Sequence, residues 1–72
     1  MVASGEIDRA IAEFQAALKL NPRSYELHNF LGVCWVAKDD LGAAIREFRE
    51  ALSLNPGFGE ARSNLGLSLI HI

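Results

Sequence analysis

The tripeptide Leu20-Asn21-Pro22 occurs a second time as Leu54-Asn55-Pro56, so equivalent residues lie 34 positions apart. Six residues before the first copy recur before the second at the same spacing: Ala10, Ile11, Glu13, Phe14, Ala17 and Leu18. Three residues after it recur in the same way: Glu26, Leu31 and Gly32. Internal repetition with a period of about 20 to 50 residues is typical of solenoids built from stacked units. The sequence therefore predicts part of a repeat array.

The composition of the 72 residues is that of one small globular domain. Half of the residues are hydrophobic and 22% are charged, which is unlike a disordered chain. The formal net charge is −2, and the Lys and Arg residues are scattered along the sequence. Because binding to nucleic acid or to anionic lipid needs clustered basic residues, we expect neither partner.

Cys34 is the single cysteine, so it has no partner for an intrachain disulfide and forms no thiolate cluster for a metal. Residues 1–6 have neither a basic start nor an apolar run, and they do not resemble a secretory signal. No stretch approaches the roughly 18 apolar residues of a membrane span. We expect a cytoplasmic protein without a membrane segment.

Apolar residues before Pro22 recur at helical spacing: Ile7, Ala10, Ile11, Phe14, Ala17 and Leu18. This spacing places them on one side of a helix, which we predict over residues 7–19. The same pattern predicts a third helix that starts at Leu41 and ends before Pro56, because proline disfavours helical conformation in the preceding residue. Ser24 is a suitable N-cap for a second helix over residues 25–38, and a fourth is predicted over residues 60–70.

The second and fourth predicted helices each contain a glycine, Gly32 and Gly66. A glycine inside a helix costs about 1 kcal/mol relative to alanine, and close approach of a neighbouring helix is the simplest compensation. The intervening turns are only a few residues long, so consecutive helices are expected to be antiparallel neighbours. Phe14 and Phe48 repeat at helical spacing and are expected in the core.

The central unit carries a longer signature. It reads His28, Leu31, Gly32 and Trp35 in one helix, then Ala44, Phe48, Ala51 and Pro56 in the next. On these residues the chain resembles the tetratricopeptide repeat family. The resemblance implies an all-α fold in which four helices form antiparallel helix-turn-helix repeats of a short right-handed α-solenoid. It divides the chain into a second half-repeat (1–24), a full repeat (25–58) and a first half-repeat (59–72). Two signature places depart from the family, where His28 and Arg62 replace an aromatic residue and Asp39 replaces a glycine.

In this family, the first helix of each repeat lines a concave groove that binds peptides or helices of other proteins. Carried over by position, the groove residues on one helix are Glu26, Asn29, Phe30, Val33, Val36 and Ala37. Those on the next helix are Glu60, Ser63, Asn64, Leu67, Ile70 and His71. One subgroup binds C-terminal carboxylates through basic and amide side chains, but Glu26, Asn29 and Val33 stand at those places, so no such clamp is expected. The groove set favours an apolar or mildly basic ligand, which the Asn and Glu side chains would orient.

These features predict a non-enzymatic module that binds a peptide or a helix of a partner protein. One alternative is a structural or self-associating segment of a longer solenoid. Another is the substrate-presenting part of an enzyme whose catalytic domain is not in this chain. No G-x-S-x-G, G-x-x-x-x-G-K or G-x-G-x-x-G motif occurs. His28 and His71 have no carboxylate or thiol at metal-ligand spacing, so we expect no metal, cofactor or catalytic residue.

The resemblance starts and stops within repeats, and residues 65–72 are apolar on more than one side. Terminal repeats of solenoids normally have a polar outer face. We therefore expect a fragment of a longer array. Its C-terminal helix, with Leu69 and Ile70, would pack against the next helix of that array or against a second copy of the chain.

Overall fold

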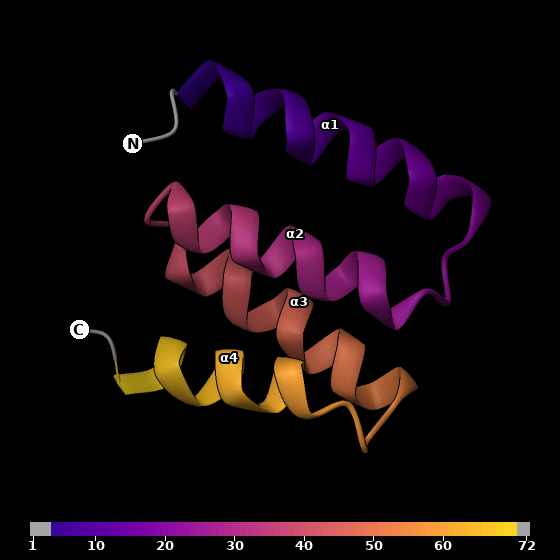
Figure 1. Cartoon of the computed structure of the whole chain (residues 1–72), viewed down its shortest axis with the longest axis vertical. Helices are drawn as coiled ribbons and strands as arrows, with labels where there is room; N and C mark the ends of the chain where they lie inside the picture. The colour runs from indigo at the N-terminus through magenta and orange to yellow at the C-terminus, as the bar shows by residue number, and fades with distance from the viewer. Residues whose placement is uncertain (1–3, 71–72) are drawn as a thin grey trace.

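The fold consists of four α-helices in a computed structural model that describes residues 4–70 (Figure 1). They are α1 (Ser4–Leu20), α2 (Tyr25–Ala37), α3 (Leu41–Leu54) and α4 (Gly59–Ile70). No strand occurs within the described residues, and each helix runs opposite to the one before it. The predicted all-α fold of antiparallel helices is confirmed. α1 begins three residues before the predicted start at Ile7, with the acidic Glu6 in its first turn where the helix dipole favours negative charge.

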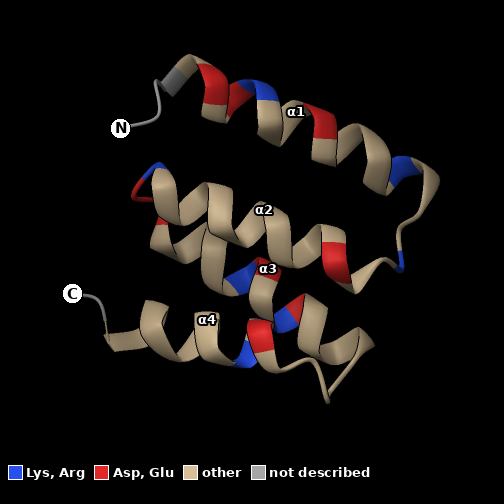
Figure 2. Cartoon of the chain, viewed as in Figure 1, with Lys and Arg blue, Asp and Glu red and all other residues tan. Residues whose placement is uncertain are grey.

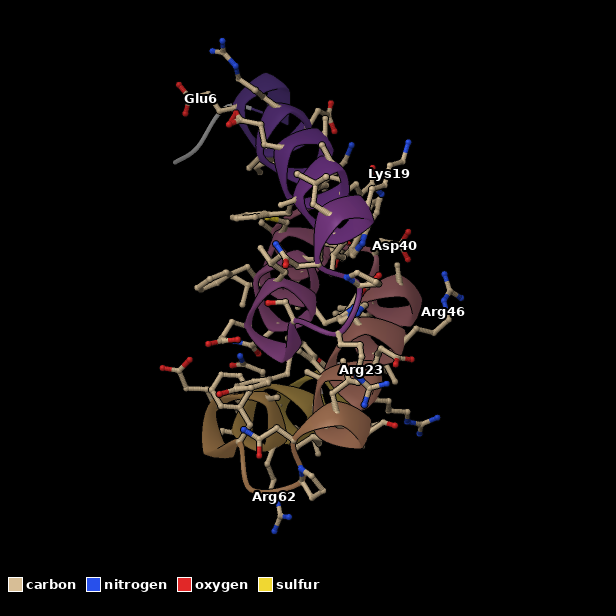
Figure 3. The ribbon with its side chains drawn as sticks, turned by 90° about the vertical axis from the view of Figure 1, so that its right-hand side faces the viewer. Glu6, Lys19, Arg23, Asp40, Arg46 and Arg62 are labelled. Atoms are coloured by element: carbon tan, nitrogen blue, oxygen red, sulfur yellow. The ribbon has the colours of Figure 1, made fainter. Side chains whose placement is uncertain are left out.

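The four helices lie in two layers. Seen from one end of the helices, α2 and α4 form one layer, and α1 and α3 form the other (Figure 3). Lys19 on α1 and Arg46 on α3 project from the second layer, away from α2 and α4. α1 and α4 lie at opposite ends of the stack, so each is packed less extensively than the two central helices (Figure 1).

Side chains cap the starts of α2 and α3, and the cap at Ser24 is the one that the sequence predicts. The Ser24 hydroxyl accepts a hydrogen bond from the Leu27 amide, and the Asp40 carboxylate accepts one from the Ala43 amide. Each side chain thereby satisfies an amide that the first helical turn leaves without a backbone partner. The fourth helix follows Phe58, which has no side-chain acceptor to serve as a cap.

The turn after α2 shows why an aspartate, Asp39, can stand where the family usually has a glycine. Asp39 has a positive φ of 63°, a left-handed conformation in which aspartate is one of the more acceptable non-glycine residues. Its amide donates to the Val36 carbonyl, and the Asp40 amide donates to the Trp35 carbonyl. This pair of bonds is the Schellman arrangement, which satisfies the last carbonyls of a helix. The departure at Asp39 therefore leaves the helix end intact.

The core is centred on the contact between α2 and α3. Phe48 and Leu31 are each 1% exposed, and Ala44 and Ala51 are fully buried beside them. The Phe48 ring lies directly on Gly32, and a Cβ atom at Gly32 would overlap the ring. The close approach predicted at Gly32 is therefore confirmed, as is the core position of Phe48. Phe14, the equivalent of Phe48 on α1, is only half-buried and stacks on Phe30 at 5.5 Å.

The close approach predicted at Gly66 is wrong for the part of the chain that the structure describes. Gly66 is exposed, and a Cβ atom added there would have no neighbour within 4 Å. The physical reason is its position on α4, at the end of the stack. No described helix occupies the place that α3 occupies beside Gly32.

The two residues that replace the family's aromatic side chain make the same hydrogen bond in successive repeats. The His28 ring nitrogen Nε2 lies 3.3 Å from the Pro22 carbonyl oxygen, and Arg62 Nη2 donates to the Pro56 carbonyl at 3.1 Å. Each bond ties a helix to the turn that precedes it. His28 Nδ1 also lies 2.8 Å from the Glu47 carboxylate, so both ring nitrogens face an acceptor. His28 and Arg62 thus each connect their helix to the preceding turn through a hydrogen bond.

The Lys38 ammonium group pairs with the Asp8 carboxylate and links the end of α2 to α1. Among the described residues, no helix is both long enough and apolar enough to cross a membrane.

The two equivalent glycines should respond oppositely to alanine. Gly32→Ala forces a methyl group against the Phe48 ring and should destabilise the fold by about 1–3 kcal/mol. Gly66→Ala meets open space and should stabilise the fold by up to about 1 kcal/mol, through helix propensity alone. Thermal unfolding followed by circular dichroism at low protein concentration measures both, with about 4–8 °C expected per kcal/mol. Equal losses in the two variants would contradict the asymmetry.

Candidate functional site

The predicted groove residues lie on α2 and α4, which run in the same direction in one layer (Figures 1 and 3). Six of them are on α2: Glu26, Asn29, Phe30, Val33, Val36 and Ala37. Five are on α4: Glu60, Ser63, Asn64, Leu67 and Ile70. His71, the twelfth, lies outside the described residues. The structure therefore places the described members of the set on two neighbouring helices, although nothing in it tests whether they bind a partner.

An open hollow of about 180 Å³ lies between α2 and α4, with α3 beneath it. It is lined by Val33, Val36, Leu41, Phe48, Asn64, Leu67 and Ser68. Four of these belong to the predicted set, namely Val33, Val36, Asn64 and Leu67. The other seven described members of the set lie on the same two helices outside the hollow.

Three lining residues were missing from the sequence prediction: Leu41, Phe48 and Ser68. Leu41 and Phe48 belong to the apolar stripe of α3, and Phe48 was expected in the core. That reading is correct for Phe48, whose ring also closes the floor of the hollow. Ser68 is buried on α4, at the position equivalent to Cys34 on α2. These residues line the hollow because the fold brings α2, α3 and α4 together. The apolar periodicity of a single helix does not contain that information.

The rim of the hollow is apolar and open to solvent. Val33 is 48% exposed and Leu67 is 63% exposed. None of the residues that line the hollow is charged. Phe30 is also exposed and extends the apolar surface towards α1, where it stacks on Phe14. Large exposed apolar patches on proteins are often interaction sites, so this surface is the candidate site.

A pair of asparagines joins the two groove helices. Asn64 Nδ2 donates to Asn29 Oδ1 at 3.0 Å, and Asn29 is only 3% exposed. A buried amide needs such a partner, since an unsatisfied polar group costs about 1–3 kcal/mol. The sequence assigned both residues to the orientation of a ligand, whereas in the structure they bind each other. Their first role is therefore to fix α2 beside α4.

The charges of the groove are acidic and lie at one end. Glu26 and Glu60 occupy the first turns of α2 and α4, and both helices begin at the same end of the layer (Figure 2). They are the only charged members of the described groove set. Glu26 accepts a hydrogen bond from the Ser24 hydroxyl at 3.5 Å. The helix dipole also favours a carboxylate at this place.

Cys34 is half-buried on α2, and burial raises the pKa of its thiol. Because the thiolate is the reactive form, the raised pKa lowers the nucleophilicity of Cys34 at neutral pH. Within residues 4–70, no group of three or more His, Cys, Asp or Glu side chains is placed to hold a metal ion.

A family model described as tetratricopeptide repeat matches residues 2–57, well over half of the chain. The chain belongs to the tetratricopeptide repeat family. Repeats of this family are typically non-catalytic modules for protein–protein interaction, and the all-helical fold with its exposed apolar groove agrees with that general role. A comparison with curated proteins found no match.

The asparagine pair predicts a measurable coupling between the groove helices. Asn29→Ala leaves the Asn64 amide without its acceptor and should destabilise the fold by about 1–3 kcal/mol. In a double-mutant cycle with Asn64→Ala, urea unfolding should give a coupling energy of about 0.5–1.5 kcal/mol. Strictly additive losses would show that the two side chains do not bind each other.

The raised pKa of Cys34 predicts slow thiol labelling. At pH 7 the folded chain should react with a disulfide reagent more slowly than the urea-unfolded chain, because less thiolate is present. The folded-state rate should then rise with pH through a midpoint above the ordinary thiol pKa. A midpoint below that of the unfolded chain would contradict the assigned cause, which is burial.

Proposed function

We propose that the groove between α2 and α4 binds an extended peptide or a helix of another protein. The observation that carries this proposal is the open apolar hollow, whose rim residues Val33, Val36 and Leu67 remain exposed. A helix laid in a groove presents apolar anchors at intervals of three and four residues, and an extended peptide presents alternate side chains. Either kind of ligand supplies one anchor to the hollow.

The size and charge of the groove limit the kinds of ligand that it can bind. Ligand pockets for drug-sized molecules measure about 300–1,000 Å³, whereas this hollow is about 180 Å³ and suits a single apolar side chain. Glu26 and Glu60 at one end favour a Lys or Arg next to the anchor. The expected ligand is therefore an apolar segment with basic residues on one side, and not a carboxylate tail.

A selection from a displayed library of random peptides tests this proposal. Binders should share an apolar anchor flanked by Lys or Arg. Val33→Glu with Leu67→Glu should abolish their binding while helicity is retained, because the anchor would then meet two carboxylates.

A matched control carries the same change in net charge on the other layer. Gln15→Glu with Ser53→Glu alters exposed positions of α1 and α3 and should leave peptide binding unchanged. A selection with the Glu26→Lys, Glu60→Lys variant should yield peptides that carry acidic residues in place of the basic ones. If the control loses binding as completely as the groove variant, the groove is not the binding surface.

A second function, a structural segment of a longer solenoid, is favoured by a different observation. Leu69 on α4 is exposed together with Gly66, so the outer side of this helix offers apolar surface for stacking. In either function, we propose residues 25–58 as one complete repeat between the half-repeats 1–24 and 59–72, in a non-enzymatic cytoplasmic protein.

A further inference from the structure

The contact between α2 and α3 has three components that can be followed along the sequence. The Phe48 ring covers Gly32, where no side chain intervenes. Ala44 lies fully buried in the same contact region as Leu31. At the end of the contact, His28 pairs with Glu47 at 2.8 Å. Together they supply a glycine face on one helix and a phenylalanine face on the other.

Each component recurs on the two outer helices at the period of 34 residues. The glycine face of α2 is repeated on α4: Arg62, Leu65 and Gly66 take the places of His28, Leu31 and Gly32. The phenylalanine face of α3 is repeated on α1: Ala10, Glu13 and Phe14 take the places of Ala44, Glu47 and Phe48. α4 and α1 therefore carry the two halves of a contact that α2 and α3 make with each other.

Both repeated faces are less covered than the contact between α2 and α3 in the described structure, although Phe14 stacks on Phe30. Phe48 is 1% exposed and its neighbours Ala44 and Ala51 are fully buried, whereas Ala10, Phe14 and Ala17 on α1 are all partly exposed. On α4, Gly66 has open space where Gly32 has a ring. α1 and α4 lie at opposite ends of the stack, so one molecule cannot join its own two faces (Figure 1).

Charge complements the shape of these faces. His28 and Glu47 form a pair within one molecule. Their equivalents in a contact between two molecules would be Arg62 of one and Glu13 of the other, which are of opposite charge. Arg62 uses one nitrogen for the Pro56 carbonyl, and its guanidinium has further N–H groups for a carboxylate. Glu13 lies 3.9 Å from Arg9 in an exposed pair, and pairs of this kind contribute little and exchange readily.

We propose that a second copy of this chain docks head to tail, with its α1 against α4 of the first and its Phe14 ring on Gly66. The contact repeats the one between α2 and α3 and stands independently of peptide binding. Because the two faces differ, the association is heterologous and leaves a free face at each end of the pair. Further copies add in the same way, and each one contributes another α2 and α4 to the same layer.

Sedimentation of the full chain over a wide concentration range tests the proposal. The expected result is a ladder of species that grows with concentration beyond the dimer. Gly66→Gln should weaken the association by about tenfold or more, because the new side chain occupies the place of the Phe14 ring. Gly42→Gln is the matched control, since it adds the same side chain at an exposed helical glycine of α3 and should leave the ladder unchanged.

A charge exchange provides a second test that does not depend on the glycine. Glu13→Arg alone and Arg62→Glu alone should each weaken the association by about two- to fivefold, because like charges then meet. A mixture of the two variants should restore it, since every contact between unlike molecules then joins opposite charges. Circular dichroism should show equal helicity in all of these variants.

Four results would each overturn the proposal. They are a monomer at every concentration, a series that stops at the dimer, a ladder that Gly66→Gln leaves unchanged, and a mixture that associates no better than its components. A monomer would assign the α4 face to the next segment of a longer chain. A closed dimer would point to a symmetric contact between equal surfaces.

Discussion

The placement of the Phe48 ring on Gly32 is the constraint on which the rest of the structure depends. The ring fills the space between α2 and α3, and only a residue without a side chain allows it there. The burial of a phenylalanine side chain contributes about 1.5–3 kcal/mol, which exceeds the roughly 1 kcal/mol that a glycine costs within a helix. Gly32 is therefore stabilising in its context, although it is unfavourable for the isolated helix.

From this contact the arrangement of the groove follows. α3 fixes α2 on one side and packs against α4 on the other, so α2 and α4 become neighbours in one layer (Figure 3). The hydrogen bond from Asn64 to Asn29 then sets them side by side. Phe48 takes part twice, because its ring both covers Gly32 and forms part of the floor of the hollow. Core packing and groove shape are thus linked through one side chain.

The order, direction and ends of the helices could be predicted from the sequence because they depend on local signals. Pro22, Ser24 and Pro56 act within a few residues of their own positions, and the 34-residue period supplies the rest. The start of α1 was missed because Ser4 and Gly5 are weak signals. The bond between Asn29 and Asn64 could not be predicted either. It joins positions 35 residues apart, one more than the period, and depends on how two helices lie side by side.

The repeat also separates two kinds of exposed apolar surface that composition alone does not distinguish. Val33 and Val36 remain exposed on α2, although this central helix has neighbours in both layers, so stacking does not cover these positions. Their equivalents Leu67 and Ile70 are exposed on α4 for the same reason. Gly66 is different, since its equivalent Gly32 is covered by α3. Exposure at the first kind of position belongs to a groove that stays open in every repeat. Exposure at the second kind arises because no described helix covers Gly66 in the way that α3 covers Gly32.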